Sequence, residues 1–195
     1  KDPAVAAMLR GDVRALTDDH MQGLFRILAL THSGMTTDEF DERVENWISR
    51  EKHPRFGRPY IDCSYLPMIE LLEYLRANGF RTYIASAGGM DFMRVWSQRV
   101  YGIPPEQVLG SYGELKYELR DGKPVLTKSL DSVFIDDKAG KPVAINHFIG
   151  RRPIAAFGNS DGDQQMIQYT TIDNPLPSFG CLLHHTDAAR EYAYD

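Results

Sequence analysis

Apolar side chains recur at helical spacing in the first part of the chain, and no run there alternates as a strand would. Residues 4–16 and 21–30 each place apolar side chains three and four positions apart, which predicts two helices. Thr36 followed by Glu39 is a capping-box pattern that predicts the start of a third helix. We therefore expect residues 1–58 to form a small helical unit of their own.

Beyond this unit, short β-branched and aromatic runs alternate with helical periodicity. The apolar runs at 80–86, 153–157 and 179–183 predict buried strands. The helical patterns around them cover residues 66–78, 90–101, 141–148 and 164–169. Asp121-Gly122, between two short apolar segments, predicts a β-hairpin. Strands that alternate with helices are typical of βαβ units, so residues 59–195 are expected to form an α/β core with a mostly parallel sheet.

The composition of the 195 residues, with 43% hydrophobic and 25% charged, is close to that of an average globular protein. It excludes intrinsic disorder and a coiled coil. No apolar run approaches the ~20 residues that cross a bilayer, and no signal-peptide segment is visible, so no membrane partner is expected. The formal net charge of −5 argues against nucleic-acid binding. Cys63 and Cys181 form no metal or disulfide pattern, and the compartment and oligomeric state stay open.

Polar residues follow the first predicted core strand in the sequence Ser86-Ala87-Gly88-Gly89. A hydroxyl and successive backbone N–H groups at such a turn can surround one oxyanion. In parallel sheets the active site lies beyond the carboxyl ends of the strands, so this turn is a candidate site. The alternative reading is a plain turn in which Ser86 is the N-cap of the following helix.

The strand predicted at 153–157 runs into the loop Gly-Asn-Ser-Asp-Gly-Asp, which ends at Asp163. Asn159, Asp161 and Asp163 place oxygen ligands within five residues, the ligand type that Mg²⁺ prefers. The alternative reading is a solvated polar loop. Two lysines, Lys138 and Lys141, precede this loop at a helix start, where an ammonium can balance phosphate charge.

The order of these motifs resembles motifs II, III and IV of the haloacid dehalogenase (HAD) superfamily, in its phosphoserine-phosphatase-like branch. The resemblance covers about residues 60–187 and implies a Rossmann-like three-layer α/β/α core with a small all-helical (C1-type) cap at 1–58. It implies a Mg²⁺-dependent phosphomonoester hydrolase that acts through an aspartyl-phosphate on a small phosphorylated substrate. Ser86 and the Ala87 amide would bind the phosphoryl group, and Lys141 would stabilise it. Asn159 and Asp163 would hold the metal.

Two departures from the family pattern change these expectations. The first metal position of the last motif is usually Asp, and Asn159 lacks its charge, so weaker metal binding is expected. No apolar strand here ends in the Asp-x-Asp sequence of motif I; Asp18-Asp19 lies in a helical region. In the family fold that strand lies between the strands predicted at 80–86 and 153–157. We therefore expect it upstream of residue 1, and we expect the 195 residues alone to be inactive.

Other functions are also compatible with these residues. A non-catalytic relative would bind a phosphorylated ligand or a protein partner. A serine hydrolase would use Ser86 with His184 or His185 and Asp187, although the Gly-x-Ser-x-Gly sequence of such enzymes is missing. In a phosphatase, substrate contacts from the cap would come from residues such as Phe25, His32, Met35 and Trp47.

Overall fold

The computed structural model describes residues 2–189 and 193, and within this range the side chains of residues 18–22 and 130 are left undescribed. The chain divides into two compact units. The first contains the residues up to Arg43 together with Gly113–Val133, and the second contains Val44–Tyr112 and the residues from Phe134 onward. Among the described residues, no helix has both the length and the apolar character needed to cross a bilayer.

The first unit begins with two helices where the sequence predicted helices at 4–16 and 21–30. Helix α1 spans Pro3–Leu9 and helix α2 spans Val13–His32. The helix predicted at 4–16 is thus divided between α1 and α2. Asp12 caps the start of α2, because its side chain accepts a hydrogen bond from the Ala15 amide at 3.1 Å. The second predicted helix is therefore the continuation of α2.

The third helix, α3 (Thr37–Ile48), begins where the capping box predicts it. The Thr36 amide donates to Glu39 at 2.8 Å, and the Glu39 amide donates to the Thr36 hydroxyl at 3.1 Å. The two side chains thus satisfy each other's unpaired backbone donors, which confirms the sequence prediction.

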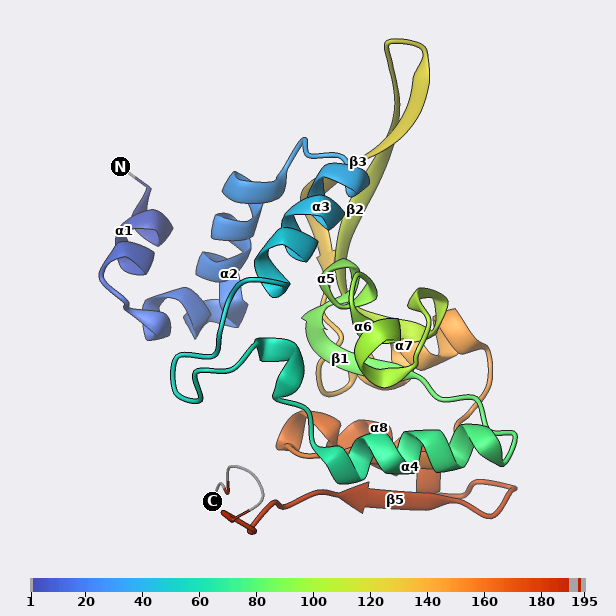
Figure 1. Ribbon diagram of the computed structural model, residues 1–195. Coiled ribbons are helices and arrows are strands. Elements are labelled where there is room, and N and C mark those ends of the chain that lie inside the picture. The colour runs from blue at the N-terminus through green and yellow to red at the C-terminus, as the bar shows by residue number, and fades with distance from the viewer. Residues whose placement is uncertain (1, 190–192, 194–195) are drawn as a thin grey trace. The chain divides into compact units, whose positions relative to one another are not determined.

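The predicted hairpin is also present, and it is much longer than the sequence indicated. Strands β2 (Val108–Arg120) and β3 (Lys123–Phe134) flank a two-residue turn in which φ is 52° at Asp121 and 75° at Gly122. Positive φ at both positions matches the twist of a hairpin, and glycine adopts it without strain. Figure 1 shows the hairpin extending beyond the helices of its unit.

The outer part of this hairpin joins the N-terminal helices through backbone hydrogen bonds. The Gly34 amide donates to the Lys128 carbonyl at 2.9 Å, and the Lys128 amide donates to the Met35 carbonyl at 2.8 Å. Thr36 forms an antiparallel bridge with Thr127. These bonds explain why Gly113–Val133 groups with the N-terminal helices, whereas the sequence placed a single boundary near residue 58. The cap role of residues 1–58 stays a prediction.

The second unit contains two pairs of parallel strands and the helices around them. Its helices are α4 (Leu66–Ala77), α5 (Met90–Arg94), α6 (Ser97–Tyr101), α7 (Gly140–Ile149) and α8 (Gln164–Thr171). Its further strands are β1 (Ile84–Gly89), β4 (Ala155–Gly158) and β5 (Phe179–Leu182). Single 3-10 turns lie at Tyr60–Asp62, Pro105–Gln107 and Asp161–Asp163. The mixed α/β class with parallel strands is confirmed.

Two elements differ from those expected, and strand pairing accounts for the first. β1 pairs with β2 from Ile84↔Val108 onward, so the strand predicted at 80–86 begins four residues later and continues to Gly89. The helix predicted at 90–101 is two short helices, with Val95 and Trp96 between them. β4 pairs with β5 from Ala155↔Phe179 onward.

Within the described part of the chain, the two strand pairs belong to separate sheets, β1-β2-β3 and β4-β5. A cavity of about 1100 Å³ is lined by residues 82–86 and by residues 153–157. Helix α4 lines it through Met68, Leu72 and Leu75, and none of the α4 residues is buried. A void of this size is far larger than those of a close-packed interior. We call it the strand groove.

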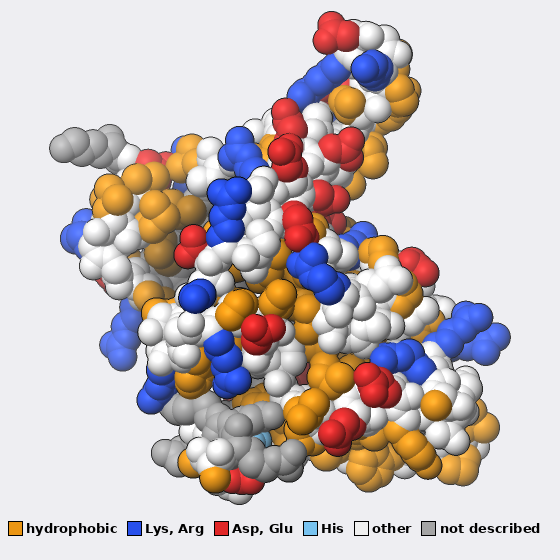
Figure 2. Space-filling model, in the orientation of Figure 1, with side chains coloured by type: hydrophobic (Ala, Val, Ile, Leu, Met, Phe, Trp, Pro, Cys, Tyr) orange, Lys and Arg blue, Asp and Glu red, His pale blue; other side chains and the backbone are white. Residues whose placement is uncertain are grey.

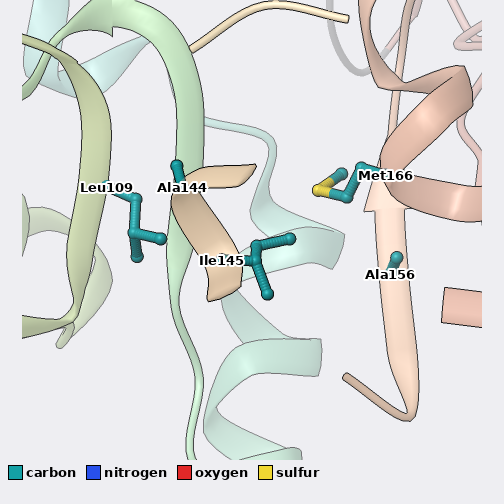
Figure 3. Packing of buried hydrophobic residues seen from close by; sticks show 5 residues of the cluster. All are labelled: Leu109, Ala144, Ile145, Ala156 and Met166. Atoms are coloured by element: carbon teal, nitrogen blue, oxygen red, sulfur yellow. The ribbon is translucent and has the colours of Figure 1, made fainter. Parts of the chain in front are cut away.

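Buried apolar side chains lie on both sides of the strand groove. One cluster joins Leu109 of β2, Ala144 and Ile145 of α7, Ala156 of β4 and Met166 of α8. Figure 3 shows the Met166 side chain pointing toward Ile145, with α7 between the two sheets. The helix that carries Lys141 is therefore packed against both strand pairs.

Candidate active site

Lys141 is the centre of the candidate site. Its side chain is only 6% exposed, and its ammonium donates to the Ala85 carbonyl at 2.7 Å and to Asp163 Oδ1 at 2.8 Å. Lys138, the other lysine considered from the sequence, is exposed and has a positive φ of 49°. One buried ammonium thus joins the first residues of β1 to the loop after β4.

Asp163 receives hydrogen bonds on both carboxylate oxygens. Besides the ion pair at Oδ1, Oδ2 accepts from the amides of Asn159 at 2.9 Å and Ser160 at 3.2 Å. Burial acts to raise the pKa of Asp163, but the hydrogen bonds from Lys141 and the Asn159 amide outweigh it and hold the pKa below its ordinary value. Asp163 is therefore an anion that its own loop fixes in place.

Gly158 allows this loop to fold back on itself. A Cβ at Gly158 would collide with the Asp163 side chain, so the loop can adopt this shape only where residue 158 has no side chain. The glycine at the end of β4 thereby lets the Asp163 carboxylate reach the amides of Asn159 and Ser160.

Ser86 lies one residue beyond the Ala85 carbonyl that Lys141 contacts. Its hydroxyl accepts from the Gly88 amide at 3.1 Å, and the Ala87 carbonyl accepts from the Ser111 hydroxyl at 2.7 Å. Helix α5 begins only at Met90, with Gly89 as its N-cap, so Ser86 does not cap a helix. Ala87 is exposed, so its amide lies in a segment that solvent can reach.

Asp136, which the sequence interpretation did not single out, is fully buried beside the site. Neither of its carboxylate oxygens has a hydrogen-bond partner of good geometry. Burial raises the pKa of Asp136 to about 6, although the nearby Lys141 charge and Ser86 amide act to lower it. The signal available in the sequence was the pair of carboxylates directly before the lysine helix.

The loop that carries Asp136 also contacts the acidic loop. The Lys138 amide donates to the Gly162 carbonyl at 3.2 Å, and the Asp136 amide donates to the Ser111 hydroxyl at 3.0 Å. The structure thus brings Ser86, Lys141 and Asp163 to one region, beside the first residues of β1 and beyond the carboxyl end of β4.

The oxygen donors expected to hold Mg²⁺ are only partly available. Asn159 and Asp161 are exposed at the loop, whereas Asp163 is buried and bonded to Lys141. Among the residues that the structure describes, no group of three or more His, Cys, Asp or Glu side chains is arranged to hold a metal. The donor chemistry suits a hard cation, but the described residues do not form a complete site. Metal binding by Asn159 and Asp163 stays a prediction.

The remaining candidate residues lie in other surroundings. His185 stacks on Tyr65 with ring centroids 5.2 Å apart. Trp47 stacks on Tyr60 at 5.0 Å and meets Phe92 edge-on at 5.9 Å. Within the first unit, Met35 is buried, Phe25 is half-buried, and His32 packs edge-on against Phe40 at 5.2 Å. The expected substrate contacts of Phe25, His32, Met35 and Trp47 stay predictions.

Comparison with known proteins gives the family directly. The model of the haloacid dehalogenase-like hydrolase family matches residues 3–168. The chain belongs to that family, as its motif order indicated. No curated protein matches the chain.

Two solved structures are similar to the chain. A conserved protein of unknown function from Anaerococcus prevotii DSM 20548 is 25% identical, with a TM-score of 0.52, over 72% of this chain and 42% of that protein. A phosphoserine phosphohydrolase-like protein from Francisella tularensis subsp. tularensis SCHU S4 is 17% identical, with a TM-score of 0.42, over 84% of this chain and 74% of that protein. The chain thus spans less than half the length of the first of these proteins.

Proposed function

We propose that the protein carrying this chain is a HAD-type phosphatase that hydrolyses small phosphomonoesters through an aspartyl-phosphate. The observation that carries the proposal is the buried ammonium of Lys141, bonded at once to Ala85 of β1 and to Asp163 in the acidic loop after β4. The phosphoserine-phosphatase-like branch, the helical cap and the dependence on Mg²⁺ are parts of this proposal.

The strand groove is where the nucleophile would enter. A further strand between β1 and β4 would cover the open edges of both and would fill the cavity that α4 lines. Unpaired backbone groups at such edges cost about 1–3 kcal/mol each when they are buried. If this strand runs parallel to its neighbours, its carboxyl end lies beside Ser86 and Lys141. An aspartate at that end would face the phosphoryl group.

Four residues of the chain would act together with the aspartate of the added strand. The aspartate oxygen bonds to phosphorus while the bond from phosphorus to the leaving oxygen breaks, and the leaving alkoxide takes up a proton from solvent. A water oxygen then bonds to phosphorus while the bond from phosphorus to the aspartate oxygen breaks, which releases phosphate and a proton to solvent and restores the carboxylate. The Ser86 hydroxyl and the Ala87 amide donate to the phosphoryl oxygens, and Lys141 balances their charge. Asp163 holds the Lys141 ammonium in position.

Mg²⁺, if bound, would be held by Asn159 and Asp163 together with the carboxylate of the added strand. It would supply charge neutralisation at the phosphoryl group. Asn159 provides an oxygen without a negative charge, so we expect this site to bind Mg²⁺ weakly.

The test is hydrolysis of p-nitrophenyl phosphate by a protein that contains both this chain and the proposed strand. We expect turnover that EDTA abolishes and that Mg²⁺ restores. The matched control replaces the proposed aspartate of the added strand by asparagine, and this variant should be inactive. On the same proposal, the 195 residues alone should show no turnover.

Three other results would point elsewhere. Binding of inorganic phosphate without turnover would favour a non-catalytic relative that recognises a phosphorylated ligand. Hydrolysis that persists in EDTA would remove Mg²⁺ from the proposal. Activity that survives the strand substitution would exclude the aspartyl-phosphate mechanism.

A further inference from the structure

The outer segment of β2, from Glu114 to Arg120, presents a strand edge that is open within the described residues. β3 lies on one side of β2, and β1 on the other side pairs with β2 only as far as Ser111. No other strand or bridge among residues 2–189 pairs with this segment. Long open edges of this kind form a template for a further strand.

The turn determines which residues face the open edge. In a two-residue turn the carbonyl of the residue before the turn accepts a hydrogen bond from the amide of the residue after the turn. The backbone N–H and C=O groups of Arg120 are therefore expected to point toward β3. Because these bonds alternate along an antiparallel strand, Leu115, Tyr117 and Leu119 direct their N–H and C=O groups outward. Tyr117 at 67% and Leu119 at 66% are also among the most exposed apolar side chains.

The side chains along this edge alternate between two faces of the hairpin. Lys116 and Glu118 share the face of Thr127 and Asp131: Lys116 donates to Asp131 at 2.7 Å, and Thr127 donates to Glu118 at 3.2 Å. The three apolar side chains of the edge therefore share the other face. Figure 2 shows side chains of both charge signs along this hairpin, with apolar side chains beside them.

The sequence Glu-Leu-Lys-Tyr-Glu-Leu-Arg at 114–120 is complementary to itself when it is reversed. In an antiparallel pair centred on Tyr117, Lys116 lies opposite Glu118 of the second copy, and Glu114 lies opposite Arg120. Leu115 lies opposite Leu119 on the other face. By symmetry each of these two ion pairs occurs twice, and all four join opposite charges. Oppositely charged side chains that lie directly across two strands stabilise a sheet.

We propose that two copies of this protein form a symmetric dimer by antiparallel pairing of their 114–120 edges. The occupant of the open edge is thus a second copy of the same chain. The charge order carries the assignment, since any shift by one residue would place charged side chains opposite apolar ones. The proposal does not depend on the phosphatase assignment.

The ion pairs within the monomer do not oppose this contact. Lys116 and Asp131 are 56% and 70% exposed, and Arg120 and Glu118 are 42% and 43% exposed. Exposed pairs contribute little to stability, and an ammonium or guanidinium has donors for a second carboxylate. Seven residues from each copy make a small interface, so the dimer belongs to the weak class below about 1,200 Å².

The test is a charge-exchange cycle measured by sedimentation velocity from micromolar to millimolar protein. Lys116→Glu and Glu118→Lys each place like charges opposite one another, and each should weaken the dimer by about tenfold or more. The double variant Lys116→Glu/Glu118→Lys should dimerise again. An equimolar mixture of the two single variants should form a heterodimer, because each supplies the charge that the other lacks.

One control variant and one further test separate this contact from a general effect of charge or folding. Lys138→Glu makes the same charge change at an exposed position outside the hairpin and should leave the dimer unchanged. Tyr117→Pro removes one outward N–H and should abolish dimerisation, with circular dichroism confirming that the variant is folded. A protein that stays monomeric at millimolar concentration overturns the proposal, as does a dimer that tolerates both single charge reversals.

Discussion

The ammonium of Lys141 lies 2.8 Å from Asp163 Oδ1, although 22 positions separate the two residues in the chain. Both side chains are almost fully buried, at 6% and 9% exposure. The same ammonium contacts the Ala85 carbonyl at 2.7 Å. The ammonium therefore fixes the first turn of α7 against β1 and against the loop after β4, and these two strands do not pair with each other.

Removing one partner of this pair is expected to destabilise the fold strongly. In Lys141→Met the buried Asp163 carboxylate keeps its charge but loses its ammonium, which costs about 3–5 kcal/mol for a buried pair. Urea unfolding measures the loss. The double variant Lys141→Met/Asp163→Asn should recover part of it, because no unpaired charge is then buried.

Lys138→Met is the matched control, since Lys138 is exposed three residues away. Its effect on the free energy of unfolding should stay within about 0.5 kcal/mol. Equal effects at the two lysines would show that the ion pair adds nothing to stability.

The contribution of the Asp163 carboxylate to the stability of the fold should disappear at acidic pH. Its pKa lies below the ordinary value in the folded state, so ionised Asp163 stabilises the fold at pH values above about 4. That stabilisation is lost as the pH falls through the folded-state pKa. The difference in unfolding free energy between the natural protein and Asp163→Asn should therefore shrink steadily from pH 5 toward about pH 2. A difference that does not depend on pH would contradict this assignment.

Ionisation of Asp136 changes the free energy of unfolding in the opposite direction to ionisation of Asp163. Its folded-state pKa is raised from 3.8 to about 6, so the unfolded chain ionises first as the pH rises. The fold then loses stability between about pH 4 and pH 6, on the order of 3 kcal/mol at 1.36 kcal/mol per pKa unit. Asp136→Asn should be more stable than the natural protein at pH 8 and similar to it at pH 3.

The exposed carboxylate of Glu73 on α4 provides the control for Asp136. Glu73→Gln makes the same change in net charge outside the site. Unfolding curves of the two variants at pH 3, 5 and 8 distinguish a local effect of burial from a general effect of charge. A destabilising Asp136→Asn at pH 8 would show that the ionised carboxylate has a partner.

Ser86→Ala is expected to lower kcat/KM for p-nitrophenyl phosphate by about 10- to 100-fold in the protein that contains the proposed strand. The hydroxyl would donate to the phosphoryl group, so inhibition by inorganic phosphate should weaken as well. Ser160→Ala is the control, since the Ser160 hydroxyl contacts Asp163 rather than the Ser86 segment of β1. Unchanged kinetics in Ser86→Ala would leave Ser86 with its turn bond to Gly88 alone.

Asn159→Asp tests the proposed metal position. A negative charge added to an oxygen-ligand site strengthens divalent cation binding, and we expect roughly tenfold tighter Mg²⁺ binding. The readouts are the Mg²⁺-dependent rise in melting temperature and the Mg²⁺ concentration for half-maximal activity. Asn159→Ala should weaken both responses. No change in either variant would place the metal elsewhere.

Features that depend on neighbouring residues were readable from the sequence. Thr36 and Glu39 close their capping box across three positions, and Asp121-Gly122 forms its turn between adjacent residues. The positions of most strands and helices follow from the same local patterns. The order of the motifs was sufficient to indicate the family, because each motif stands next to a strand or helix that the local pattern predicts.

Long-range packing decided what the sequence left open. Which lysine is buried, where β1 begins, and how the hairpin groups with the N-terminal helices all depend on partners tens of residues away. Asp136 shows this most clearly, because the pair Asp136-Asp137 marks a polar position in the sequence but does not show which of the two carboxylates is fully buried.

By itself, the sequence determined the family, the local elements and the types of residue in the site, since hydrogen bonds and apolar periodicity between near neighbours set them. Only the tertiary structure decided that Lys141 joins β1 to the loop after β4, that Asp136 is buried, and that a groove separates β1 from β4. These features arise from the packing of distant segments, whose contacts no local pattern encodes.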